Sequence, residues 1–133
     1  MSKDIKQQVT FDATPHAVYD ALLDSKQHAA FTGDTARASK KVGGRFKSYG
    51  TYIEGVNVEL IEGRRIVQAW RASDWPTGVY SIATFSLDLA GKGKTKLVFT
   101  QTGVPHAKHK TITQGWKDFY WRPMKLYFAS RKK

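Results

Sequence analysis

The sequence offers few side chains whose type and spacing could support catalysis or metal binding. His106 and His109 lie three residues apart, a spacing that can place two metal ligands on one face of a helix. A zinc site needs three or four protein ligands, and no third ligand lies nearby, so ordinary surface histidines are the better interpretation. The sequence has no cysteine, which excludes thiolate metal sites and a thiol nucleophile. We therefore predict no catalytic residue and no metal site.

One glycine-containing segment has a weak similarity to a phosphate-binding loop. Lys92-Gly93-Lys94-Thr95 has the residue types that end such a loop. The motif also needs a glycine five residues before Gly93, where this sequence has Asp88. It further needs a helix after the loop, whereas strand-forming residues follow here. A hairpin turn is the better interpretation, and no cofactor is predicted.

The net charge of +11 is concentrated in two segments. Residues 26–50 carry six Lys or Arg against one acid, and residues 106–133 carry eight against one. Such a balance favours a partner that is acidic, whether a protein, a nucleic acid or an anionic membrane surface. No motif that reads nucleic acid accompanies the charge, so we expect nucleic-acid binding to be weak and salt-sensitive at most. A purely solubilising surface is the alternative.

Six segments rich in β-branched and aromatic residues show the pattern of strands. Turn signals lie between or beside them at Glu54-Gly55, Glu62-Gly63 and Gly91-Lys92-Gly93. Short connections favour antiparallel hairpins, because parallel strands need long crossovers. The predicted strands are residues 5–11, 45–53, 56–62, 64–72, 79–89 and 95–102.

Two short helices are predicted after the first strand. Thr14 is an N-cap residue followed by Pro15, so a helix should cover residues 15–24. A second helix over residues 25–31 would be capped by Ser25 and would end near Gly33.

The last part of the sequence returns to a helical period over residues 110–128, and Pro123 should kink this helix. On its charged face Trp121 projects beside Lys117 and Lys125, which makes it an interaction residue or one that packs under a loop. The opposite face carries an apolar stripe made of Ile112, Trp116, Phe119, Tyr120, Pro123 and Tyr127.

These elements predict an α+β fold in which a curved antiparallel sheet of about six strands wraps around a long C-terminal helix. Core packing is the simplest role for the aromatic residues between sheet and helix. The alternative is that they line an apolar cavity, the usual form of a small-molecule site. The predicted lining residues are Phe46, Trp70, Phe85, Phe99, Trp116 and Tyr120.

Size and composition agree with one globular domain over residues 1–133. Hydrophobic residues make up 41% of the chain, and no run approaches the ~20 apolar residues that a membrane helix needs. We expect a cytoplasmic protein that does not insert into membranes and has no enzymatic activity.

An ordered set of short motifs resembles the activator of Hsp90 ATPase homologue-like family, whose members are START-like (Bet-v-like) domains. The most specific motifs are the run QTGVP at residues 101–105 and the pattern GW-x-x-x-YW that begins at Gly115. The similarity extends over nearly the whole sequence. The further motifs are Gly43-Gly44-Arg45-Phe46, Gly50-Thr51-Tyr52, Trp70-Arg71 and Trp75-Pro76.

The resemblance implies a helix-grip fold and two functions. The first is binding of a small apolar or amphipathic ligand between the sheet and the C-terminal helix. The second, an alternative, is a co-chaperone-like module that binds an Hsp90 homologue or another acidic protein and modulates its ATPase. In the family's co-chaperone a separate N-terminal domain supplies the main anchoring, so we expect association through this domain alone to be weak. The expected partner contacts are Lys40, Lys41, Lys47, Lys117, Trp121 and Lys125.

Overall fold

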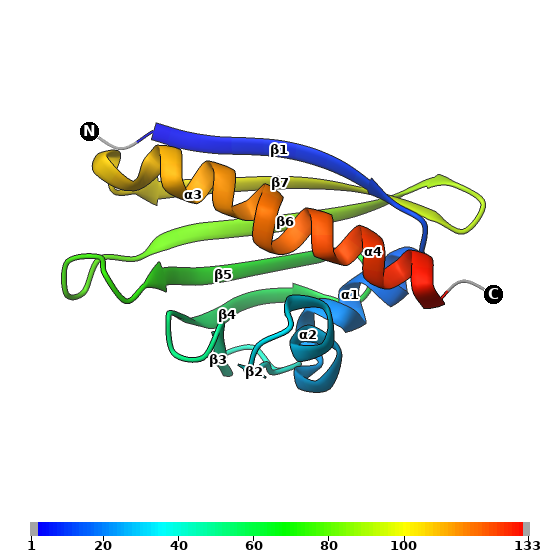
Figure 1. Cartoon of the computed structure of the whole chain (residues 1–133), viewed down its shortest axis with the longest axis horizontal. Helices are drawn as coiled ribbons and strands as arrows, with labels where there is room; N and C mark the ends of the chain where they lie inside the picture. Colours follow the sequence, from blue (N-terminus) through cyan, green and yellow to red (C-terminus); the bar gives the residue numbers. More distant parts are fainter. Residues whose placement is uncertain (1–2, 132–133) are drawn as a thin grey trace.

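The computed structural model describes residues 3–131 as one curved sheet with helices on its concave side (Figure 1). The elements follow in the order β1 (Lys3–Phe11), α1 (Pro15–Leu23), α2 (Ser25–Thr32), β2 (Ala36–Arg37), β3 (Arg45–Ser48), β4 (Ile53–Ile61), β5 (Arg65–Ala72), β6 (Ser81–Gly91), β7 (Lys94–Val104), η1 (His106–Lys108), α3 (His109–Trp116), η2 (Lys117–Trp121) and α4 (Arg122–Arg131). The predicted α+β helix-grip architecture is confirmed.

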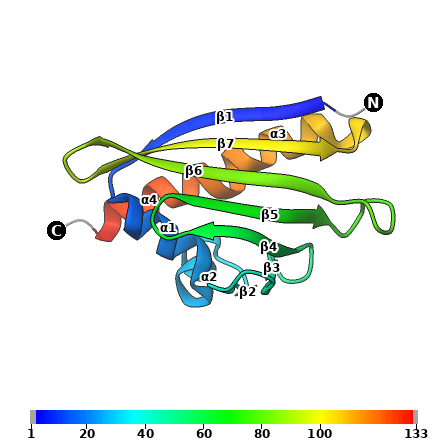
Figure 2. The ribbon, with the colours of Figure 1, turned by 180° about the vertical axis from the view of Figure 1, so that it is seen from behind.

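The sheet is antiparallel and has seven strands in the order β1-β7-β6-β5-β4-β3-β2. Neighbours in the sequence from β2 to β7 are neighbours in the sheet, whereas β1 joins β7 at the far edge. Figure 2 looks onto the outer face of the sheet, and the C-terminal helix lies behind the strands in this view. The helix therefore covers the inner face, and most of the outer face has no helix over it.

The seventh strand is β2, two residues that the sequence pattern does not predict, and a second difference lies in the strand predicted over residues 45–53. That segment is split after Ser48 by a turn in which Tyr49 and Gly50 have φ angles of 52° and 69°. The predicted turn at Glu54-Gly55 is wrong, because both residues lie inside β4. A Cβ atom on Gly55 would lie 2.5 Å from Cζ of Phe46, so this glycine admits the Phe46 ring across the sheet.

The two N-terminal helices form with one difference in capping. The Thr14 hydroxyl accepts a hydrogen bond from the backbone N–H of Ala17 at 3.2 Å, as expected for an N-cap. The N-cap of α2 is Asp24 and not Ser25: the Asp24 carboxylate accepts from the Gln27 N–H at 2.9 Å. Gly33 ends α2 in the left-handed conformation, as predicted.

The C-terminal helix is continuous from His109 to Arg131, but it contains a π-turn over Lys117–Trp121. The Arg122 N–H bonds to the carbonyl of Lys117, five residues back, so the turn holds one more residue than an α-turn. The face that meets the sheet is displaced by one position from there on. Trp116 and Trp121, five residues apart, are both buried and stack with ring centroids 5.3 Å apart.

The displaced register corrects the predicted apolar stripe in its second half. Phe119 is 56% exposed and Tyr127 is half-buried, whereas Met124 and Phe128 are buried. Pro123 lies two residues after the end of the π-turn, so the expected irregularity takes this form. None of the helices within residues 3–131 combines the length and the hydrophobicity needed to cross a membrane.

Candidate functional site

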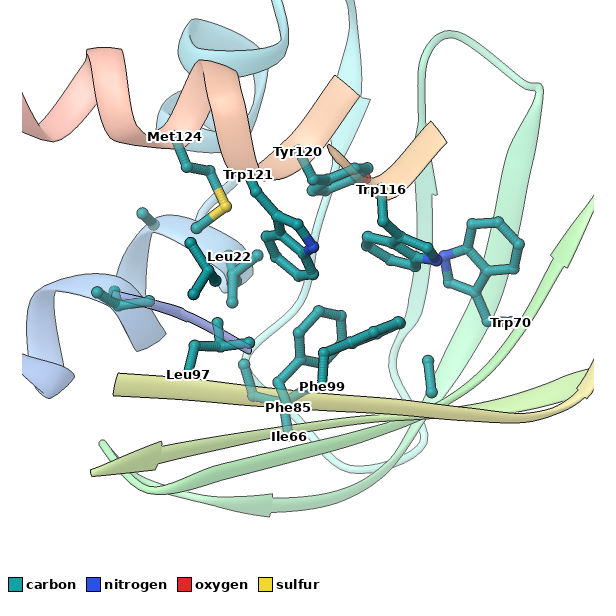
Figure 3. Close-up of a cluster of buried hydrophobic side chains, with 14 of the residues drawn as sticks. Leu22, Ile66, Trp70, Phe85, Leu97, Phe99, Trp116, Tyr120, Trp121 and Met124 are labelled. Atoms are coloured by element: carbon teal, nitrogen blue, oxygen red, sulfur yellow. The ribbon is translucent and has the colours of Figure 1, made fainter. Parts of the chain in front are cut away.

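All six predicted cavity residues are buried between the C-terminal helix and the sheet. Figure 3 shows Trp116 and Trp121 pointing from the helix toward Phe85 and Phe99 on the sheet, with Tyr120 close beneath the helix. The exposed fraction is 7% or less for each of Phe46, Trp70, Phe85, Phe99, Trp116 and Tyr120. The sequence pattern therefore identified side chains that lie together between the helix and the sheet. Their burial does not by itself leave room for a ligand.

Trp116 lies at the centre of this group and fills most of the space under the helix. Its ring centroid lies 4.3 Å from that of Phe99, 4.7 Å from Tyr120 and 5.4 Å from Trp70. Five of the six residues, all except Phe99, line an interior cavity of only about 20 Å³. Such a volume holds about one water molecule. The space beneath the middle of the helix is thus a packed core.

A larger pocket opens beside this core, between the β3–β4 turn and helix α3. Its volume is about 240 Å³, and Trp70, Trp116 and Tyr120 form its floor. The remaining walls are Tyr49, Tyr52, Ile53, Thr111, Ile112, Gly115 and Phe119. No charged side chain lines it, so its chemistry suits an apolar or aromatic group.

Sequence reasoning missed the Tyr49 and Tyr52 side of this pocket, since it placed both residues within one strand over residues 45–53. Their turn could have been suspected from Gly50, because glycine readily adopts a positive φ. Phe119 was expected in the core, and the π-turn instead exposes it at the pocket mouth.

Tyr49 connects the β3–β4 turn to the C-terminal helix. Its hydroxyl donates a hydrogen bond to the carbonyl of Phe119. In an α-helix that carbonyl would accept from the N–H of residue 123, but Pro123 has no N–H to donate. The Tyr49 ring also packs edge-on against Phe119 at 5.7 Å, and burial raises the pKa of Tyr49 to about 12, so the hydroxyl keeps its proton.

A second hydrogen-bonded connection crosses the core at Tyr120. His28 Nδ1 lies 3.0 Å from the carbonyl oxygen of Leu22 and donates to it, which leaves Nε2 as the acceptor for the Tyr120 hydroxyl at 2.9 Å. Ser48 Oγ lies 2.8 Å from the same hydroxyl. Burial lowers the pKa of His28 and raises that of Tyr120. Both side chains are therefore neutral, and they connect α2, β3 and the helix.

A third connection fixes Trp116 over the sheet. Its indole N–H donates to Gln101 Oε1 at 2.7 Å, and Gln101 Nε2 donates to Ser81 Oγ at 2.9 Å. The Ser81 hydroxyl in turn donates to the carbonyl of Trp70 at 2.8 Å. Each side chain in this series of hydrogen bonds has a partner, so the floor of the open pocket is held in one arrangement.

The structure does not bring the predicted partner contacts together. Lys117 and Lys125 are exposed on the C-terminal helix, whereas Lys47 points from the opposite, outer face of the sheet. Lys41 is exposed in the segment before β3. Lys40 is also exposed, but it pairs with Asp20 at 3.6 Å.

The prediction that Trp121 lies on the charged outer face is wrong. This residue is 5% exposed and its indole N–H donates to Gln7 Oε1 on β1 at 2.6 Å. The physical reason is the π-turn, whose extra residue brings Trp121 onto the buried face beside Tyr120.

The described part of the chain, residues 3–131, contains no group of three His, Asp or Glu side chains that could hold a metal ion. The candidate sites offer an apolar pocket on one side and exposed cations on both faces.

Comparison with known proteins identifies the family of this chain. Residues 12–129 match the family described as "Activator of Hsp90 ATPase homolog 1-like protein". A Dictyostelium discoideum protein named "Activator of 90 kDa heat shock protein ATPase homolog" is 34% identical over 116 residues, which is 87% of this chain and 30% of the relative. The human "Activator of 90 kDa heat shock protein ATPase homolog 1" is 29% identical over 90% of this chain and 35% of its own length. The chain thus spans about a third of these relatives.

A solved structure shares the fold closely. The crystal structure titled "PFC0360w, an HSP90 activator from plasmodium falciparum" superposes with a TM-score of 0.89 at 21% identity, and the match covers 95% of this chain and 96% of that one. Because the family match extends over most of the described residues, the chain belongs to the Activator of Hsp90 ATPase homolog 1-like family.

Proposed function

We propose that this protein is a binding module that associates with an Hsp90-type chaperone and modulates its ATPase activity. The observation that carries the proposal is the 34% identity to a relative named for activation of that ATPase, over 87% of this chain. The matched region is about a third of the relative, so the activity of the whole relative is a hypothesis for this chain.

Two physical features support a role in protein binding. The space under the middle of the helix is filled by aromatic side chains, which removes the large interior cavity that a dedicated ligand carrier would need. The net charge of +11 favours an acidic partner, because complementary charge accelerates encounter and selects orientation.

The test is ATP turnover by the purified chaperone with and without this protein at low ionic strength, together with a direct binding measurement. We expect saturable binding that weakens steeply as salt is added, since exposed charges more than about 10 Å apart are screened at 0.1 M salt. An unchanged turnover and no association at a large excess of this protein would refute the proposal.

A second function, binding of a small apolar ligand, is supported by the open pocket of about 240 Å³. This volume is slightly below the roughly 300–1,000 Å³ typical of sites for drug-sized molecules, so the ligand should be small, such as a molecule with one or two rings. The aromatic floor of Trp70, Trp116 and Tyr120 favours a flat ligand.

Gly115 allows a sharp test of the ligand proposal. It lies in helix α3 at the pocket wall, and an added Cβ would meet only Phe119 Cδ2, at 3.9 Å. Gly115→Leu should fill the pocket, whereas Gly115→Ala is the matched control that keeps it open. Native mass spectrometry of the freshly purified protein should show a bound small molecule that Gly115→Leu loses and Gly115→Ala retains. Equal occupancy in the two variants would place any ligand elsewhere.

A further inference from the structure

Three cationic side chains form a cluster on the outer face of the β2–β3 edge, away from the C-terminal helix. Arg37 and Lys47 are direct partners in the β2–β3 ladder, and Arg45 lies two residues before Lys47 on the same face of β3. All three are exposed. They line an open groove of about 530 Å³ that also has Thr35 and Thr51 among its walls, and no acidic residue lines it.

The positive charge of this cluster is not compensated by the fold. Arg37 lies directly opposite Lys47, an arrangement of like charges that destabilises a strand pair. Glu54 is the partner of Lys47 on the other side, but its carboxylate accepts from Arg71 Nη1 at 3.0 Å. Within residues 3–131, no carboxylate oxygen lies within 4.0 Å of the side-chain nitrogens of Arg37, Arg45 or Lys47.

Arg71 binds the carboxylate of Glu54, the residue that lies opposite Lys47, and so competes with Lys47 for it. The Arg71 side chain is only 11% exposed, and Nη2 also donates to the carbonyl of Trp75 at 2.8 Å. A buried guanidinium cannot give up its carboxylate partner without a large desolvation cost. The three outer cations are therefore left without a salt-bridge partner among residues 3–131.

The spacing of the cluster matches an extended chain. Arg45 and Lys47 are two residues apart on one strand, which separates their Cα atoms by about 6.6–6.8 Å. Acidic residues at alternate positions of an extended peptide repeat at the same distance. A single phosphate would take up one anion position between the paired Arg37 and Lys47, whereas carboxylates at alternate positions of a peptide give Arg45 and Lys47 one partner each. β2 is moreover the edge of the sheet and has only two residues, so nothing in the sheet lies beyond it.

We propose that the outer face of the β2–β3 edge binds an extended acidic segment of a protein partner, with carboxylates at alternate positions contacting Arg37, Arg45 and Lys47. The inference rests on the proposed function in one respect: the partner is the chaperone. It replaces the predicted contact at Trp121 by a surface on the opposite side of the molecule.

The experiment compares two triple variants with the same change in net charge. Arg37→Glu/Arg45→Glu/Lys47→Glu reverses the cluster, and Lys92→Glu/Lys94→Glu/Lys96→Glu reverses three exposed lysines of the β6–β7 hairpin. The probes are the chaperone, a short peptide alternating Glu and Thr, a peptide of the same composition with its Glu residues in one block, and inorganic phosphate. We expect the first variant to lose at least about tenfold in affinity for the chaperone and the alternating peptide, and the second to lose about threefold or less.

Each outcome has a definite meaning. If the two triple variants lose affinity equally, the attraction depends only on net charge and the inference is overturned. Equal affinity for the two peptides would overturn it as well. Phosphate that displaces the peptide at similar concentrations would point to a simple anion site and also overturn it. Peptide binding at the cluster without any chaperone association would refute the proposed function while supporting recognition of an acidic segment.

A milder variant separates binding from folding. Arg37→Gln/Lys47→Gln removes the like-charge pair, so its melting temperature should equal or exceed that of the parent. If this variant keeps its melting temperature and full affinity for the alternating peptide, the proposed contact is wrong.

Discussion

Replacing Tyr49 by phenylalanine removes a single hydroxyl, and the free energy that this change costs should depend on residue 123. The hydroxyl donates to the Phe119 carbonyl, which lacks its ordinary helical donor because residue 123 is proline. Tyr49→Phe therefore leaves that carbonyl without the Tyr49 donor. Pro123→Ala restores an N–H that can reach the same oxygen.

The magnitudes follow from the structure. A net hydrogen bond contributes about 0.5–1.5 kcal/mol, so Tyr49→Phe should lower the free energy of unfolding by about 1 kcal/mol in the parent. In the Pro123→Ala background the carbonyl has a backbone donor, and the same change should cost about 0.3 kcal/mol or less. The coupling between the two positions is then about 0.5–1 kcal/mol, large enough for a double-mutant cycle.

Urea unfolding followed by tryptophan fluorescence measures all four proteins of the cycle, since the chain has four tryptophans. Tyr52→Phe is the matched control on the same turn: its hydroxyl makes a long 3.4 Å contact to exposed Asp74, so the effect should be small and independent of residue 123. If Tyr49→Phe costs the same free energy in both backgrounds, the hydroxyl does not substitute for the missing N–H.

Three further predictions test the core. Trp116→Ala should cost about 3–5 kcal/mol, because Trp116 is 3% exposed and anchors the polar chain below it; a melting point within a degree or two of the parent would contradict its core position. Trp121→Ala should cost a similar amount and Phe119→Ala less than about 0.5 kcal/mol, and comparable losses in urea titrations would refute the displaced helix register. Burial lowers the pKa of His28 below 6.5, so the unfolded chain binds more protons and stability should fall as pH decreases below 6.5, by at most about 1.4 kcal/mol per pH unit. His28→Gln should flatten this slope, and an unchanged pH profile would mean that His28 is not buried in its neutral form.

Periodicity in the sequence was sufficient to predict the sheet, the three helical regions and the aromatic residues between them. The errors fall where local geometry departs from a regular period. The turn with positive φ at Tyr49 carries a residue type that is usual in strands, so the sequence pattern over residues 45–53 does not reveal the break. Gly55 was interpreted as a turn residue, although its role is to let the Phe46 ring cross the strand. Such close approaches depend on partners far away in the sequence.

The candidate site was predicted in its composition but not in its shape. Trp70, Trp116 and Tyr120 do line the open pocket, yet the other walls come from the missed turn and from Phe119. The positions of Phe119 and Trp121 depend on a π-turn, which holds one residue more than an α-turn. A helical projection uses a fixed angle per residue and therefore cannot represent this additional residue. The cluster of Arg37, Arg45 and Lys47 depended on the two-residue strand β2, which is too short to produce a pattern.

The pairing of β1 with β7 has a consequence for how the chain acquires its structure. Lys3 is aligned with Val104, and Gln7 on β1 accepts from Trp121 while donating to the carbonyl of Thr113. The first strand thus finds its partners only after nearly the whole chain is available. During synthesis residues 3–11 must remain unpaired until β7 and the helix have left the ribosome, and loops this long make folding slow. The two ends of the described chain lie at opposite ends of the long axis in Figure 1. A circular permutant that opens the β6–β7 turn and joins the ends through a linker long enough to span the molecule would keep these contacts and change the order in which they form.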